Sequence, residues 1–516
     1  MTVRTAPAEV PAADRDRRAR WLVVAGPAAV VVALASALGA GAFTGAFAAL
    51  AEFTDVGAVV RWGLPVLDVT TGLASALTLG ALVTAAALVG PGRWQRTALT
   101  TAGAAAAVWA LAGVAGLVLQ YADISATRLD ATGFGEGLWQ FLTEIELGRT
   151  GLAIVILAAV TSAMALASTS AVGALWTCVA PLAAFAYQAS TGHAAGAASH
   201  SLAVGAMTLH LVGAALWVGG LGAIGVLVLA AGRTRPAGTP SVGAASEPHA
   251  GSRGKPGAEP SGPDGWEAAV PRYSHVASWC LVAVGFSGVV SAWIRVGNLG
   301  DLGSRYGLLL VVKAVLLAGL GALGWAHRRR VLRDLGLLAP DAGSGGPQAR
   351  GPARRRPALL GPARAWAFAR LAAVELIVMG AVMGVAVGLA ASAPPVPDDV
   401  PVDTSPAYQL TGSPLPPELT GARWFTEWRL DPLSAFACAA AVVVYVVWTR
   451  RLARRGDRWP VGRTVAWCLG MAVIAWDTNG GRRSTARCCS APTWCSTWCS
   501  RCWCRCCWCS RRPSRS

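Results

Sequence analysis

The sequence predicts an all-α, polytopic integral membrane protein, a helical bundle of about eleven transmembrane helices. Of its 516 residues, 54% are hydrophobic, and the mean hydropathy is +0.49. Apolar stretches of about 20 residues recur along the chain, which is the length that a helix needs to cross a bilayer. A helix satisfies its own backbone polar groups within hydrocarbon, so these stretches indicate helices embedded in lipid.

The eleven expected spans follow one another from the N-terminus. Glycine and alanine are frequent within them, which favours close helix packing in lipid. The first span is too long for the apolar segment of a cleavable signal peptide, so we expect it to persist as a helix. The spans are residues 21–43, 62–90, 98–120, 149–168, 171–190, 202–231, 275–295, 306–326, 366–391, 432–449 and 461–476.

Arginine-rich segments set the expected orientation. They precede the first span and follow the second, sixth, eighth and tenth spans. If every span crosses, all of these segments lie on one side, which the positive-inside rule identifies as the cytoplasm. The opposite loops are acidic or neutral. We therefore predict a cytoplasmic N-terminus, and we interpret the net charge of +17 as an orientation signal rather than as a nucleic-acid-binding surface.

Composition between the spans predicts the domain organisation. Residues 1–20 are a basic cytoplasmic tail, and residues 21–391 are the main membrane domain. Its two cytoplasmic linkers, 233–270 and 339–364, are rich in Gly and Pro, so we expect them to be disordered. Residues 392–418 are Pro-rich and extended. We expect them to form an extracytoplasmic linker between this domain and a second membrane module.

Three charged side chains lie well within the expected spans: Asp68, Lys313 and Glu375. On insertion scales a charged side chain at the centre of a bilayer costs about 2.5–3.5 kcal/mol. We therefore expect each of these residues to have a charged partner or a functional role. Lys313 and Glu375 lie on consecutive antiparallel helices, which allows a buried structural charge pair. The alternative is that Glu375 lines a path for a cation.

Glu375, Met379 and Met383 follow at intervals of four residues and share one face of their helix. Methionine in an apolar helix usually fills space. However, the chain has only six methionines, and thioethers are soft ligands suited to Cu(I). The residues of this face therefore either fill space between helices or form part of a metal path.

The histidines cluster on the expected outer face. His193 and His200 flank a loop of small residues, His210 lies about ten residues into the sixth span, and Met207 precedes it by one turn. Imidazole and thioether both suit copper, so His193, His200, Met207 and His210 are the candidate metal site. The alternatives are interfacial histidines that cap helices, and haem ligation.

Two segments resemble the copper resistance D family, CopD: "HLVGAALWVGGL" at residues 210–221, and residues 273–332. The second has an aromatic-Ser start, a Gly-containing helix, a "W-x-R" exit, a later "YG", the mid-helix Lys313 and a basic end. The "VEL" around Glu375 fits the same pattern. The likeness covers roughly residues 200–391, and the first four spans more loosely. It implies that the metal is copper.

Residues 419–481 resemble the start of the cytochrome c oxidase assembly factor family CtaG. The likeness rests on "DPL" after an aromatic-rich loop and on "RWP" followed by "RTVAW". A fusion of the two families implies copper handling at the bacterial cytoplasmic membrane. The implied partners are the lipid bilayer, the copper ion, a periplasmic copper chaperone and cytochrome c oxidase subunits.

Residues 482–516 have a different character. Nine of the 13 cysteines lie there, interleaved with Trp and Arg, without the loop that a tetrahedral zinc site needs between Cys pairs. Restoring one base after Gly481 turns the tail into an apolar helix that contains "HMVQH". We therefore predict that residues 482–516 are an out-of-frame product and that the CtaG-like domain, 419–481, is truncated.

These patterns favour copper transport or copper handling across the membrane, linked to copper supply for oxidase assembly. No nucleotide-binding motif and no nucleophile–base pair point to an enzyme. Two alternatives stay open: a haem-binding electron-transfer membrane protein, and a non-transporting scaffold for oxidase assembly. The lack of paired histidines deep in facing helices argues against the first.

Overall fold

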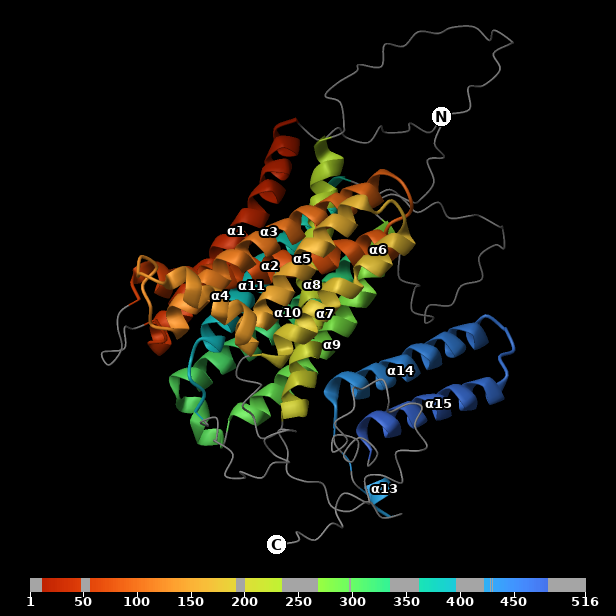
Figure 1. Ribbon diagram of the computed structural model, residues 1–516. Helices are drawn as coiled ribbons and strands as arrows, with labels where there is room; N and C mark the ends of the chain where they lie inside the picture. The colour runs from red at the N-terminus through yellow and green to blue at the C-terminus, as the bar shows by residue number, and fades with distance from the viewer. Residues whose placement is uncertain are drawn as a thin grey trace. The chain divides into compact units, whose positions relative to one another are not determined.

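The computed structural model describes residues 12–47, 56–191, 200–233, 268–296, 298–334, 362–395, 422–426, 428 and 430–480. The tail 482–516 and almost all of the linkers 233–270, 339–364 and 392–418 lie outside these residues. Within the described residues the regular structure is entirely helical (Figure 1). The α-helices are α1 (Ala12–Thr44), α2 (Ala58–Val83), α3 (Arg93–Ile124), α4 (Phe134–Glu144), α5 (Glu146–Ala167), α6 (Ala171–Thr177), α7 (Val179–Ser190), α8 (His200–Arg233), α9 (Ala269–Arg295), α10 (Arg305–Asp334), α11 (Pro362–Ala390), α13 (Arg423–Thr426), α14 (Pro432–Arg454) and α15 (Val461–Asn479).

Ten helical segments of the described chain are long and apolar enough to cross a membrane. This confirms the prediction of an all-α, multi-pass membrane bundle. Each segment overlaps one of the first ten expected spans. The eleventh expected span, 461–476, is the helix α15, but Arg463 and Asp477 shorten its apolar stretch, and it does not belong to this set.

Two details of the helices differ from the expected spans. The span 171–190 is interrupted at Cys178, where α6 ends and α7 begins. Pro181 has no N–H to donate to the carbonyl of Thr177, so the helical ladder cannot continue there. In addition, the acidic loop after α3 contains the unexpected helix α4. Tyr121 of α3 packs on Phe134 and Phe141 of α4, with ring centroids 5.0 and 5.8 Å apart.

The chain divides into two compact units. The first comprises residues 1–188, 211–285 and 296–395, and the second comprises residues 189–210, 286–295 and 396–516. The helices α8 and α9 each contribute to both units.

In the first unit, α1 and α11 pack through small residues. Gly380, Gly384 and Gly388 recur every four residues on α11, and a β-carbon added at any of them would overlap α1. At Gly384 the overlapped atom is the carbonyl oxygen of Ala33, whose own side chain is fully buried. At the ends of the two helices, Ser392 Oγ donates a hydrogen bond to Thr44 Oγ1 at 2.7 Å. This close approach is the usual way for helices to gain contact in lipid.

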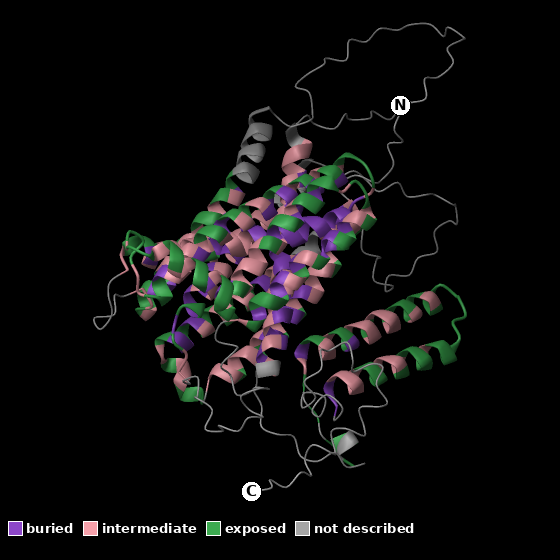
Figure 2. Ribbon diagram, in the orientation of Figure 1, coloured by how far each residue is buried: buried purple, intermediate pink, exposed green. Residues whose placement is uncertain are grey.

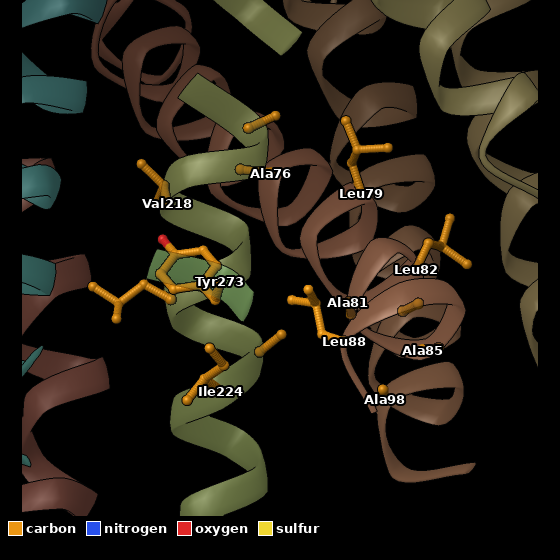
Figure 3. Packing of buried hydrophobic residues seen from close by; sticks show 14 of the residues in the cluster. Ala76, Leu79, Ala81, Leu82, Ala85, Leu88, Ala98, Val218, Ile224 and Tyr273 are labelled. Atoms are coloured by element: carbon orange, nitrogen blue, oxygen red, sulfur yellow. The ribbon is translucent and has the colours of Figure 1, made fainter. Parts of the chain in front are cut away.

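The main hydrophobic cluster of the first unit surrounds α2 and α8. The cluster includes Leu79, Leu82 and Ala85 of α2 and Val218 and Ile224 of α8 (Figure 3). The phenol of Tyr273, from α9, donates a hydrogen bond to the backbone carbonyl of Trp217. Gly220 leaves the room that the Tyr273 ring occupies. A buried phenol needs such a partner, so this bond fixes α9 on α8.

The α2 helix ends in a π-helical turn, Thr84–Leu88. Side chains from two other helices bond the carbonyls of this turn. Gln95 Nε2 donates to the carbonyl of Ala85, and Arg272 donates through Nη1 to that of Leu88, both at 3.0 Å. Gln95 is buried, so its amide is part of the core rather than of the surface.

The second unit contains the hairpin of α14 and α15. Asp431 caps α14 by accepting from the backbone N–H of Leu433, and Tyr445 stacks on Trp467 with ring centroids 5.1 Å apart. Asn479, at the end of α15, accepts from the backbone N–H of Asp431 at 2.6 Å. Most side chains of the hairpin are exposed or half-buried (Figure 2). Such a surface suits contact with lipid or with further helices.

Candidate metal site

The predicted metal-site residues lie at the start of α8. His193 is outside the described residues, and His200 is the first residue of the helix, with its side chain not described. Met207 and His210 are both half-buried. The spacing of three residues places Met207 and His210 on one side of α8. The helix therefore brings these two predicted residues to one side, and the placement of His193 and of the His200 side chain stays a prediction.

His210 has a buried partner on α9. Its Nδ1 lies 3.1 Å from Ser287 Oγ, and the side chain of Ser287 is fully buried. In the tautomer with a proton on Nδ1, His210 donates to Ser287, and this bond orients the imidazole ring. Metal-binding imidazoles are commonly oriented in this way. Ser287 could not be predicted as a partner from the sequence, because the pairing depends on how α8 and α9 pack.

Small residues of α8 allow this approach. A β-carbon added at Gly213, one turn after His210, would lie 3.2 Å from Val284 Cγ2 and 3.4 Å from Ala283 Cβ of α9. These spacings are tight, so a larger residue would push the two helices apart. Gly213 therefore supports the geometry in which His210 meets Ser287.

The start of α14 also contacts this part of α8. A β-carbon at Gly205 would lie 2.5 Å from Asp431 Oδ1 and 3.1 Å from Pro432 Cδ. In addition, Phe286 of α9 stacks on Phe436 of α14, with ring centroids 6.4 Å apart. The beginning of the hairpin is thus packed against the segment of α8 that carries the predicted ligands.

The second predicted group lies on α11. Glu375 is half-buried, Met379 is 2% exposed within the main cluster, and Met383 is half-buried. The methyl carbon of Met383 lies 3.3 Å from the position of a β-carbon on Gly72 of α2. The row therefore runs along α11 and meets α2 at Gly72.

Lys313 lies half-buried on α10, which packs beside α11. The expected charge pair of Lys313 with Glu375 stays a prediction. Among the residues described with their side chains, no three His, Cys, Asp or Glu groups form a ready-made metal site. Some of the predicted ligands lie outside that part of the chain, and others are methionine thioethers, which do not belong to these four residue types, so soft-metal binding has to be tested directly.

Three family models match separate parts of the chain. Residues 59–202 match "Copper resistance protein D-like, N-terminal domain", residues 267–389 match "Copper resistance protein D", and residues 443–489 match "Cytochrome c oxidase caa3 assembly factor (Caa3_CtaG)". These matches confirm the resemblance to both families that the sequence motifs indicated. The first match also covers spans where the motif likeness was loose. The third ends at residue 489, within the predicted out-of-frame tail.

The similar curated proteins are uncharacterized proteins of mycobacteria. One from Mycobacterium bovis is 38% identical over 73 residues, which is 14% of this chain and 11% of that protein. One from Mycobacterium leprae is 37% identical over 77 residues, 15% of this chain and 11% of that protein. The chain thus spans about a tenth of the length of these relatives. No solved structure matches the chain.

Proposed function

We propose that this multi-pass membrane protein, which joins regions matching copper resistance protein D to part of a caa3 oxidase assembly factor, moves or holds copper ions at a bacterial cytoplasmic membrane. The N-terminus faces the cytoplasm in this proposal. The single observation that best supports it is the bond between His210 and Ser287. A buried hydroxyl orients an imidazole that lies one turn from a thioether, in an otherwise apolar helix.

The proposed outer site uses His193, His200, Met207 and His210. Imidazole and thioether groups together bind copper well, and thioethers favour the cuprous ion. On α11, Met383, Met379 and Glu375 offer similar chemistry along one helix face. A carboxylate at the end of this row offsets the positive charge of an ion that has left water. No step of this proposal involves covalent catalysis, so the protein acts as a carrier or holder and not as an enzyme.

The assembly-factor match suggests where the copper goes. The start of α14 packs on Gly205 of α8, between His200 and His210 in the sequence. The hairpin thus adjoins the segment that carries the proposed outer ligands. We propose that this arrangement links copper to cytochrome c oxidase assembly, with a periplasmic copper chaperone and oxidase subunits as partners.

A double variant, His200→Ala with His210→Ala, tests the copper site. We expect cells that express it to lose the copper accumulation seen with the parent chain, and the purified protein to bind less copper in equilibrium dialysis. His275→Ala is the matched control, because His275 bonds the backbone carbonyl of Pro271 on α9 and has no proposed ligand role. Unchanged copper accumulation and binding in the double variant would overturn the assignment.

A scaffold that assembles the oxidase without moving copper is the second candidate. The observation that favours it is the hairpin of α14 and α15, which the bond between Asp431 and Asn479 joins at its base and which overlaps the region matching the assembly factor, residues 443–489. Co-purification with oxidase subunits, together with no copper flux in proteoliposomes, would support the scaffold over the carrier.

A further inference from the structure

Asp68 stands out among the charged residues of the spans. It lies on α2 ten residues after Ala58, about 15 Å along the helix axis. The span that contains α2 is 56% buried, the largest share among the ten spans of the described chain. From Val69 to Ala86 no residue of this span is exposed, whereas Asp68 is exposed. Asp68 is therefore the exposed residue that directly precedes the unexposed stretch of this span.

The residues around Asp68 contact two other helices. Pro65 and Val69 on either side are buried, and Val69 packs with Ala33 and Ala37 of α1. Gly72 lies one turn deeper on the same face as Asp68, and a β-carbon added there would lie 3.3 Å from the methyl carbon of Met383 on α11. The helices α1 and α11 thus flank this part of α2, and the side chain of Asp68 is exposed beside them.

The carboxylate of Asp68 has no compensating group in the described part of the chain. No hydrogen bond or ion pair to it is formed by any described residue. The nearby hydroxyls of Thr71 and Ser75 donate to the backbone carbonyls of Asp68 and Gly72 in their own helix. A carboxylate left in this way at membrane depth is costly, which makes a cationic ligand the simplest compensation.

We propose that Asp68 and Met383 form a cation site at the base of an opening on the predicted outer side, and that its ligand is a soft monovalent cation such as Cu(I). This inference rests on the proposed function and adds a site to it. The carboxylate supplies charge, and the thioether one turn deeper supplies a soft donor. From there, Met379 and Glu375 follow on α11 toward its other end. The sequence motifs gave Asp68 no role, because its relation to Met383 depends on the packing of α2 against α11.

Cysteine labelling tests the opening. We expect Asp68→Cys in the full-length protein to react with a membrane-impermeant maleimide added to the outer side, which raises the label by about one per chain over the parent. Val69→Cys is the control, because Val69 is 1% exposed on the next position of the same helix. Equal labelling of the two variants would overturn the opening.

Ag(I), a redox-stable stand-in for Cu(I), tests the site. We expect Asp68→Asn to lose about one bound Ag(I) per chain in equilibrium dialysis and to slow Cu(I) flux into proteoliposomes about tenfold or more. Asp68→Glu should restore both, and Asp123→Asn, at the exposed end of α3, should change neither. Met383→Leu should weaken Ag(I) binding without changing the labelling of Asp68→Cys.

The outcomes separate this inference from the proposed function. If the parent chain binds and moves copper and Asp68→Asn behaves like the parent, the Asp68 site is wrong and the copper function stands. If the parent chain neither binds Ag(I) nor moves Cu(I), both are wrong. Should Asp68→Asn fail to fold, a loss of Ag(I) binding in Asp68→Glu beyond that of Asp123→Asn decides against the site.

Discussion

Gly80 of α2 and Gly219 of α8 bring the backbones of two membrane helices into direct contact. A β-carbon added at Gly80 would overlap the carbonyl carbon of Gly219, and one added at Gly219 would overlap the carbonyl oxygen of Ala76. Both sides of the crossing are backbone, so no side chain can move away to make room. This crossing holds α2 and α8 together in the main cluster.

Gly219→Ala should therefore destabilise the protein. We expect a loss of about 1–3 kcal/mol in the free energy of unfolding, because the backbones must separate. Gly225→Ala on the same helix is the matched control, since a β-carbon there meets open space. Its helix propensity should instead stabilise by up to about 1 kcal/mol. Thermal unfolding of the detergent-solubilised variants measures both, and equal shifts would contradict the crossing.

Ser287→Ala should weaken copper binding at the proposed outer site while the fold stays intact. Removing the hydroxyl frees the His210 ring to rotate, and lost orienting partners commonly cost about 10–100-fold in metal affinity. Isothermal titration of purified protein with copper would measure the change. Ser278→Ala is the control, because its hydroxyl bonds the carbonyl of Ser274 in the same helix. The same affinity in both variants would show that Ser287 does not orient a ligand.

Asn479→Ala should loosen the hairpin of α14 and α15. The Asn479 side chain is 3% exposed, accepts from the N–H of Asp431 and donates to Ser434 Oγ at 3.2 Å. Leaving such buried groups unpaired costs about 1–3 kcal/mol. Hydrogen exchange should accelerate in the first turn of α14. Asp457→Asn, in the exposed connection of the hairpin, is the control. Similar exchange in both variants would show that the bonds of Asn479 to Asp431 and Ser434 do not stabilise the hairpin.

Arg128→Gln should raise the pKa of Asp130. In the native protein the side-chain hydrogen bond from Arg128, with Nε 3.0 Å from Asp130 Oδ1, is the main cause that lowers this pKa. The ionised form accepts the bond, so its small stabilisation is present above the ordinary pKa and is lost as the pH falls through the lowered value. A carbon-13 carboxyl titration would follow the change, with Arg149→Gln as control.

The stability of the protein should hardly respond to the same substitution. The side chains of Arg128 and Asp130 are 64% and 73% exposed, so solvent screens their attraction. An unfolding temperature that fell markedly in Arg128→Gln but not in Arg149→Gln would contradict a surface role for the pair.

The sequence predicted the membrane helices well, because apolar runs report burial in lipid directly. It missed α4, since an eleven-residue helix in a polar loop has no such run and becomes visible only when Tyr121 packs on Phe134. The break at Cys178 can be predicted from Pro181, which lacks a backbone N–H. The partner of His210 cannot be predicted, because Ser287 lies 77 residues later in the chain and meets His210 only through tertiary packing. The approach of Met383 on α11 to Gly72 on α2 could not be predicted for the same reason.

The pairing of α1 with α11 has a consequence for biosynthesis. About 300 residues separate the end of α1 from the start of α11. At translation rates of about 5–20 residues per second, the first helix waits about 15–60 seconds in the membrane before its partner emerges from the ribosome. The row of small residues on α1 lacks the matching glycines of α11 during that interval, so insertion of α11 is the event that completes this helix pair. Any ribosome stall before α11 would leave an open intermediate for quality-control proteases.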